Sequence, residues 1–241
     1  MLNPVKNELP VCQVAICTPT AGTIHAAYCM SLTRMILYFL QTPVLPDVYS
    51  AKRVTTHMYV GASISENRDK MCDKAIELGA THLLFIDDDM GFAPECLNIA
   101  LMRQVPIVLA NYRRKNPPGT FTAYENDESI AGKEIITTHD STSLVPCLNG
   151  GFGFCLIETD VLRQMPKPRF LNQYLPQVDR YSTEDWPFFT KVRELGIPAF
   201  VDQEISKRVW HNGSFAYTFD QELDPNWAVP YPERITYNKA S

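Results

Sequence analysis

The stretch THLLFIDDDMGF (residues 81–92) decides the fold class. Its short apolar run, residues 83–86, is bounded by polar residues, which predicts a strand buried on both faces of a sheet. Three carboxylates, Asp87, Asp88 and Asp89, follow with no basic residue among them. In open α/β sheets, ligands bind beyond the carboxyl ends of the strands, so this acidic cluster would lie at the ligand-binding edge.

Adjacent carboxylates repel one another unless a cation or water neutralises them. Their oxygen atoms suit Mg²⁺ or Mn²⁺, so the cluster is a candidate site for a divalent metal. An acidic turn without a metal accounts for the same residues, and the cluster alone does not separate these two interpretations.

The composition is that of a globular protein, because 45% of the 241 residues are hydrophobic and 20% are charged. The net charge of −5 gives no general attraction to a nucleic-acid backbone. Seven cysteines without a CxxC pair predict reduced core thiols in a reducing compartment. The N-terminus lacks a signal-peptide apolar region, and the longest apolar stretch, residues 35–40, is too short to cross a bilayer. We expect a cytoplasmic protein without integral membrane contact.

Strand and helix patterns alternate along the chain, which predicts one α/β domain with a mostly parallel sheet. Residues 116–146, with their Pro and Gly residues, predict a small β excursion, and residues 166–181 predict an irregular loop. Strands are expected at 11–17, 54–60, 83–86, 107–110 and 197–201, with a further strand entered from the Gly-rich turn within 147–157. Helices are expected at 24–40, 63–79, 94–103, 160–165 and 182–196.

Arg68 is unusual because it falls on the apolar face of the second predicted helix. An unpaired guanidinium is costly to bury, so we expect a carboxylate or phosphate partner, unless its head reaches solvent. Glu184 and Asp185 open a later helix, where acids also complement the helix dipole. The glycines of the turn at residues 150–153 either admit a ligand close to the backbone or permit a bulge.

Taken in order, these motifs resemble those of a GT-A fold glycosyltransferase, closest to the family 2 type, over residues 11–214. A DxD motif after a buried strand, a Gly-Gly turn and an acidic pair before a helix together form a fairly specific set. The resemblance implies a Rossmann-like domain with a nucleotide-sugar half at about residues 10–115, an acceptor half at about 116–215 and an extension at 216–241.

The resemblance also implies transfer of a hexosyl or N-acetylhexosaminyl group from a nucleoside-diphosphate sugar, with a UDP-sugar favoured, and Mn²⁺ or Mg²⁺ as cofactor. Which of the three aspartates binds the metal directly stays open. The implied donor site is Thr18, Pro19, Thr20, Arg68, Asp87 and Asp88, the metal site is Asp87, Asp89 and His211, and the acceptor site is Gly150, Gly151 and Trp186.

In the same resemblance, Asp185 is the base of an inverting reaction and Glu184 is a neighbour that orients the acceptor. A helix N-terminus lowers the pKa of a carboxylate, so Asp185 would be ionised at neutral pH. The basic cluster at residues 113–115 would suit an anionic acceptor or the donor diphosphate. A polysaccharide, a protein side chain and a hydroxylated base in modified nucleic acid all stay open as acceptors, as do the stereochemistry and the oligomeric state.

Two other classes of protein compete with this interpretation. A nucleotidyltransferase of similar fold would normally carry a Gly-rich, basic loop after the first strand, and residues 18–23 contain no Lys or Arg. A non-catalytic nucleotide-sugar binding module would be expected to lack the acidic cluster or the acidic pair, and both are present.

Overall fold

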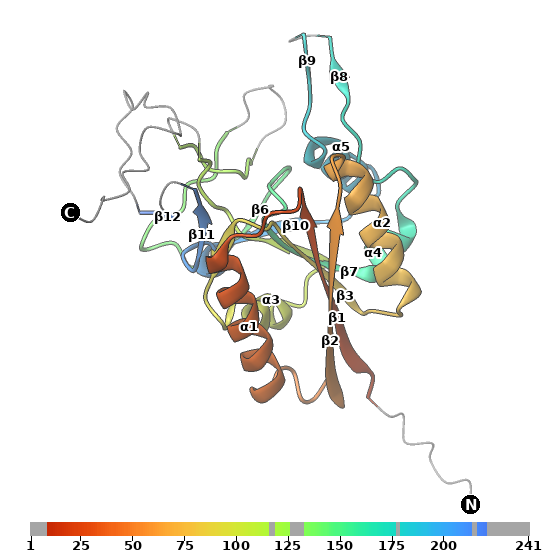
Figure 1. The fold of residues 1–241 in the computed structure, drawn as a ribbon, viewed down its shortest axis with the longest axis vertical. Helices are drawn as coiled ribbons and strands as arrows, with labels where there is room; N and C mark the ends of the chain where they lie inside the picture. Colours follow the sequence, from red (N-terminus) through yellow and green to blue (C-terminus); the bar gives the residue numbers. More distant parts are fainter. Residues whose placement is uncertain (1–8, 116–118, 126–132, 177–178, 214–215, 221–241) are drawn as a thin grey trace, which may run out of the picture.

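A seven-stranded sheet forms the centre of the computed structural model, which describes residues 9–115, 119–125, 133–176, 179–213 and 216–220 (Figure 1). Five of its strands point the same way, whereas β7 and β6 run antiparallel to their neighbours. The prediction of an α/β fold with a mostly parallel sheet is confirmed. In spatial order the strands are β2 (Ala51–Val60), β1 (Val11–Thr20), β3 (His82–Ile86), β7 (Phe154–Glu158), β5 (Ile107–Leu109), β10 (Ala199–Asp202) and β6 (Leu144–Pro146).

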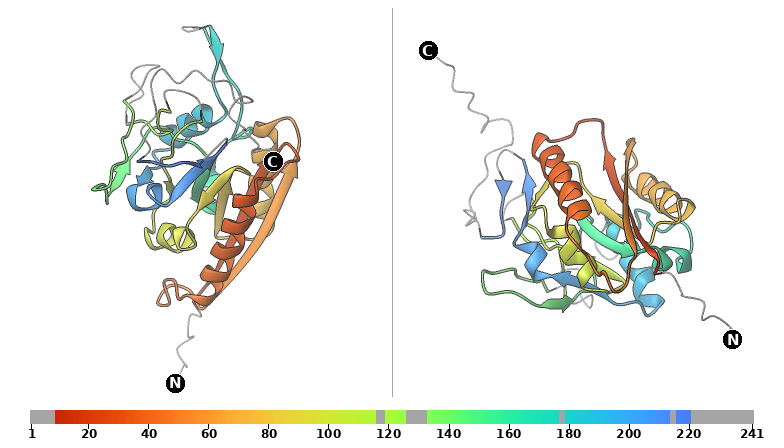
Figure 2. Two further views of the ribbon diagram at one scale, coloured as in Figure 1. Left: turned by 60° about the vertical axis from the view of Figure 1, so that its left-hand side comes forward. Right: turned by 90° about the horizontal axis from the view of Figure 1, so that it is seen from below.

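Helices cover both faces of the sheet, and Figure 2 shows α1 and α2 on opposite sides of it. The layer with α1 also contains α3 and α6, and the layer with α2 also contains α4 and α5. The helices are α1 (Ala26–Gln41), α2 (Ile64–Glu77), α3 (Cys96–Met102), α4 (Thr159–Gln164), α5 (Asp185–Glu194) and α6 (Gln203–Ser206).

The apolar side chains of β3 pack into two hydrophobic cores, one on each face of the sheet. Leu83 and Phe85 pack into the core under α2, whereas Leu84 and Ile86 pack into the core under α1, as the two-residue repeat of a strand requires. All five residues of β3 are buried. The predicted strand with two buried faces is therefore confirmed.

The side chain of Ser63 caps the start of α2, because its hydroxyl accepts a hydrogen bond of 3.4 Å from the backbone N–H of Glu66. The helix ends before Gly79, which has a φ of +66° that a residue without Cβ adopts at little cost. The helix after the acidic cluster is shorter than predicted. It begins at Cys96, with residues 94 and 95 in a turn, and not at Pro94.

A second, three-stranded sheet joins β4 (Met90–Phe92), β11 (Val209–Asn212) and β12 (Ala216–Tyr217). Neither this sheet nor the hairpin of β8 (Tyr174–Leu175) and β9 (Arg180–Tyr181) follows from the sequence patterns, which predicted an irregular loop for the hairpin. In Figure 1 the hairpin projects away from the central sheet beyond α5.

The excursion is held to the sheet by Asn111, which is fully buried. Its side-chain amide donates to the carbonyl of Ile135 at 2.6 Å, and its carbonyl accepts from the N–H of Ala123 at 3.0 Å. Within the excursion, Tyr124 and Glu134 form an isolated antiparallel β-bridge. Residues 116–118 and 126–132 of the excursion, and 221–241 of the predicted extension, lie outside the described residues.

All seven cysteines are free thiols, and all but Cys29 are buried, as the core interpretation predicts. Among the described residues, no helix combines the length and the hydrophobicity that crossing a lipid bilayer would require.

Candidate functional site

The three aspartates lie in a tight turn between β3 and β4, at the carboxyl end of the parallel strands. The backbone N–H of Met90 donates to the carbonyl of Asp87 at 3.1 Å and closes this turn. Because β3 and β4 belong to different sheets, the three side chains leave the turn in different directions. The carboxylates therefore have different partners, and the expectation of one shared site is only partly met.

Asp87 points inward to Arg68, the buried arginine that the sequence singled out. The Arg68 guanidinium is paired with Asp87 Oδ1 at 2.9 Å and with Glu184 Oε1 at 3.2 Å, and its side chain is only 4% exposed. Its Cζ atom lies 5.3 Å from the ring centroid of Phe85 and 5.0 Å from that of Phe152. The expected carboxylate partner of Arg68 is confirmed, and there are two of them.

This pairing joins the two predicted halves of the site, because Asp87 follows β3 and Glu184 precedes α5. Among the described residues, Nη1 of Arg68 is buried without a hydrogen-bond partner, whereas the other two nitrogens pair with the carboxylates. Direct contact between Arg68 and a donor stays a prediction.

Asp89 points the opposite way, to His211 and Lys115. His211 Nε2 lies 3.3 Å from Asp89 Oδ1, and the Lys115 ammonium donates to Asp89 Oδ2. Burial alone would raise the pKa of Asp89, but the hydrogen bonds and charges of His211 and Lys115 outweigh burial and lower it to about 2. Asp89 is therefore ionised at neutral pH.

His211 reaches Asp89 because β11 pairs with β4, which sets His211 opposite Met90. Its Nδ1 lies 3.1 Å from the carbonyl oxygen of Arg113. A carbonyl only accepts hydrogen bonds, so Nδ1 carries a proton, and Nε2 either carries a second proton and donates to Asp89 or presents a lone pair to a metal ion. His211 Nε2 and Asp89 Oδ1 can lie this close only with a proton or a metal ion between them.

Asp88 lies on the side of β1, where its carboxylate bonds with the Thr20 hydroxyl. Burial raises its pKa, the Thr20 bond opposes this, and the charges of Asp89 and Asp87 raise it further. The backbone carbonyl of Asp88 accepts from the N–H of His25 at 3.0 Å, which fixes the start of α1 against the acidic turn.

The predicted nucleoside-pocket residues are less open than expected. Thr18 is 1% exposed, and its hydroxyl hydrogen-bonds with that of Tyr28 in the core. Pro19 is also buried, and the Thr20 hydroxyl accepts from the N–H of Gly22 at 3.0 Å, which shapes the loop after β1. The side chain of Thr18 is used in packing, so its assignment to a nucleoside pocket is not supported.

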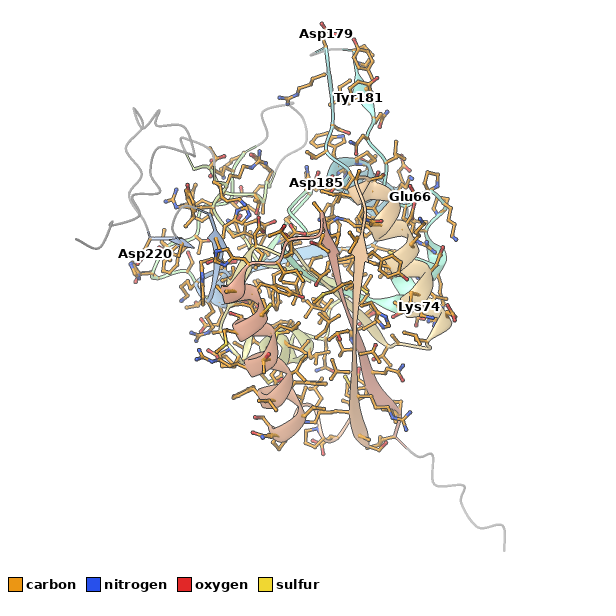
Figure 3. All side chains as sticks on the ribbon, viewed as in Figure 1. Glu66, Lys74, Asp179, Tyr181, Asp185 and Asp220 are labelled. Carbon is orange, nitrogen blue, oxygen red and sulfur yellow. The ribbon has the colours of Figure 1, made fainter. Side chains whose placement is uncertain are left out.

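Asp185 opens α5 at the base of the β8–β9 hairpin, as Figure 3 shows. Burial raises its pKa, hydrogen bonds from Thr183 and the N–H of Trp186 oppose this, and the charge of Glu184 raises it further. The expected lowering by the helix N-terminus is therefore wrong in direction, because desolvation exceeds it. A raised pKa makes the carboxylate a stronger base.

Gly150 and Gly151 are buried, and side chains explain why they are glycines. A Cβ on Gly151 would lie 2.4 Å from the Tyr112 hydroxyl, and one on Gly150 would lie 2.2 Å from Leu109 Cδ1. Close packing of these side chains therefore accounts for the glycines without either the ligand or the bulge that the sequence left open. Trp186, the third predicted acceptor residue, is half-buried in the first turn of α5.

Sequence reasoning missed Tyr112, a buried residue whose hydroxyl accepts from the N–H of Gly153 at 2.9 Å. Burial raises the pKa of Tyr112 well above its ordinary value, and the charge of Asp87 adds to the shift. Its ring also packs edge-on against that of His211, with centroids 5.4 Å apart. The glycines of the turn were the available signal, because they leave room for this ring.

The described residues contain no group of three or more His, Cys, Asp and Glu side chains placed to hold a metal ion. Asp87, Asp89 and His211 are thus not brought together as one set of ligands. Asp89 and His211 nevertheless fit a divalent ion, because their facing acceptor atoms lie 3.3 Å apart. Mg²⁺ sites commonly use one or two protein ligands, with substrate phosphates and water completing the shell.

No protein-family model and no curated protein matches the sequence. Among solved structures, the chain is similar to A197 from STIV, with a TM-score of 0.52 and 17% identity over 83% of this chain and 85% of that one. A nucleoside-diphosphate-sugar pyrophosphorylase from Vibrio cholerae RC9 has a TM-score of 0.40 and 9% identity, over 82% of this chain and 94% of that one. TarS 1–349 from S. aureus also has a TM-score of 0.40, with 15% identity over 80% of this chain and 58% of that one. The likeness to A197 shows the fold, and the other two are too weak to bear on function.

Proposed function

We propose that this protein is a glycosyltransferase that moves a sugar from a nucleoside-diphosphate sugar, with a UDP-sugar favoured, to an acceptor hydroxyl. The observation that carries the proposal is the Arg68 bridge, which holds an acidic turn at the sheet edge beside a second acidic pair at the start of α5. Sugar transfer needs both sites, one for the leaving diphosphate and one for the proton of the acceptor.

At the first site, cleavage of the sugar–phosphate bond leaves negative charge on the diphosphate. A divalent cation held by Asp89 and His211, Mn²⁺ or Mg²⁺, would supply Lewis-acid stabilisation of that charge. The carbonyl of Arg113 keeps His211 in the tautomer that presents Nε2, and Asp89 is ionised because its pKa is lowered to about 2. Asp88, the other predicted donor-binding aspartate on this side, bonds with Thr20 at the end of β1.

At the second site, Asp185 would take the proton of the acceptor hydroxyl as that oxygen attacks the anomeric carbon. Its pKa is raised, chiefly by burial, which strengthens it as a base. Glu184 is held by Arg68 and is therefore oriented as a neighbour of the acceptor. Attack by the acceptor itself, without a covalent enzyme intermediate, would invert the configuration of the sugar.

The first test is calorimetric titration of UDP, GDP and their sugars, with Mn²⁺ and separately with a chelator. We expect Mn²⁺-dependent binding of one nucleotide, with UDP favoured. Nucleoside triphosphate binding in place of diphosphate binding would point to the nucleotidyltransferase alternative. Diphosphate binding without turnover against any acceptor would point to a binding module. If no nucleotide binds under either condition, the glycosyltransferase proposal is wrong.

A further inference from the structure

Each carboxylate oxygen of Asp89 contacts a side chain of the protein itself. His211 lies at Oδ1, and the Lys115 ammonium donates to Oδ2. The backbone carbonyl of Asp89 also accepts from the N–H of Asn212 at 2.8 Å and from its side-chain amide at 3.0 Å. The residue proposed to bind the metal is therefore already neutralised by a cation of the protein itself.

The path of the Lys115 side chain is built into the fold. Its stem passes over Gly213, where an added Cβ would lie 2.9 Å from Lys115 Cδ and 3.1 Å from the Tyr217 ring. A larger residue at position 213 would push the stem away from Asp89. The ammonium thus reaches the acidic turn because a glycine leaves it room.

Lys115 differs from the other cations near the site in what it can do. Arg68 is 4% exposed and held by two carboxylates, whereas the Lys115 side chain is 33% exposed and carries a single charge on a flexible stem. Arg113 donates to the carbonyls of Gly119 and Phe219, at 2.9 and 3.1 Å. Of these three side chains, Lys115 alone is both accessible and directed at the acidic turn.

We propose that Lys115 exchanges partners during donor binding: it neutralises Asp89 in the free protein and binds a phosphate oxygen of the donor in the complex. This inference rests on the proposed function. When Asp89 and His211 share a divalent cation, the Lys115 ammonium is repelled by that charge and has to leave Oδ2. Phosphate oxygens of the donor would complete the shell of that cation, within reach of the Lys115 ammonium, and an ammonium group is a good phosphate ligand.

The exchange predicts two effects of opposite sign for Lys115→Met. Mn²⁺ alone should bind the variant roughly tenfold more tightly than the wild type, because nothing competes for Asp89. UDP should bind the variant, at saturating Mn²⁺, roughly tenfold or more weakly, because a charge-assisted hydrogen bond to phosphate is lost. A residue with a merely structural role would not move the two affinities in opposite directions.

Both affinities can be measured on the full chain, Mn²⁺ by the electron paramagnetic resonance signal of the free ion and UDP by calorimetry. Arg114→Met is the matched control, because Arg114 is the exposed neighbour and removes the same charge without facing Asp89. It should leave the Mn²⁺ affinity unchanged. Lys115→Arg keeps the charge and should restore UDP affinity. Gly213→Ala moves the stem without removing the charge and should tighten Mn²⁺ binding.

Equal Mn²⁺ affinity in the wild type and Lys115→Met, including no measurable binding in either, would overturn the exchange. So would unchanged UDP affinity in Lys115→Met. If the wild type binds UDP with Mn²⁺ and only these differences are missing, the exchange fails and the proposed function stands. If the wild type binds no nucleotide at all, the proposed function fails and the exchange fails with it.

Discussion

Replacing Arg68 by Met should destabilise the fold far more than replacing a surface arginine. The substitution leaves Asp87, 29% exposed, and Glu184, 17% exposed, without their shared cation. Removing one partner of a buried ion pair costs about 3–5 kcal/mol, and the partial exposure of both carboxylates places this case near the lower limit, at about 3 kcal/mol. Methionine fills the space of the arginine stem between Phe85 and Phe152, so little of the loss would come from a cavity.

The measurement is urea unfolding followed by circular dichroism. With a slope of about 3 kcal/mol per molar urea, a loss of about 3 kcal/mol lowers the midpoint by roughly 1 M. Arg163→Met is the matched control, since Arg163 is 45% exposed and pairs with Asp160, which is 79% exposed. Its effect should stay within about 0.5 kcal/mol, as for other exposed ion pairs.

A second substitution separates the ion pairs from the rest of the Arg68 side chain. In the wild type, Glu184→Gln should destabilise the protein, because Arg68 loses a charged partner. In the Arg68→Met background the same change should stabilise it, because it removes a buried charge that has no partner. A loss below about 1 kcal/mol for Arg68→Met, or the same effect of Glu184→Gln in both backgrounds, would refute this account of Arg68.

Three further predictions concern the two acidic sites. Asp185→Asn should abolish sugar transfer while keeping or raising the free energy of unfolding at pH 7, because the raised pKa of Asp185 means that its charged form is disfavoured in the folded state; transfer at the wild-type rate would reject Asp185 as the base. Asp89→Ala should remove Mn²⁺-dependent UDP binding in calorimetry, and retained binding would move the metal site elsewhere. The lowered pKa of Asp89 stabilises the fold above its ordinary value of 3.8, and this contribution is lost as the pH falls toward about 2. Between pH 3.8 and about pH 2, the Asp89→Asn variant should therefore lose less stability than the wild type. The measurement is the urea midpoint of both proteins as a function of pH.

Local sequence patterns predicted much of this fold because its signals are short in range. The apolar run of β3 and the start of α2 at its Ser63 cap each depend on a few consecutive residues, and both are confirmed. The position of Arg68 on an apolar helix face predicted a carboxylate or phosphate partner, because burying an unpaired guanidinium is costly. That argument does not depend on knowing which carboxylates would come close, and it gave the correct class of partner.

The parts that sequence reasoning missed depend on contacts between distant segments. The pairing of β4 with β11 brings His211 to Asp89, and the turn before β4 separates the carboxylates of Asp87 and Asp89. The direction of the Asp185 pKa shift depends on burial, which the helix-dipole argument does not include. The glycine turn was ambiguous because its neighbour, Tyr112, lies 41 residues away from Gly153.

The antiparallel strand β7 explains why these distant segments meet at one edge. A parallel strand ends at the carboxyl edge of the sheet, whereas an antiparallel strand begins there. Because β7 lies between β3 and β5, the turn that precedes it arrives beside the residues that follow both neighbours. The N–H of Asp87 accordingly donates to the carbonyl of Gly153 at 3.3 Å, and the N–H of Gly153 donates to Tyr112 at 2.9 Å. The acidic turn is thus anchored from its inner side, and Asp88 and Asp89 lie on its outer side, where the proposed donor would bind.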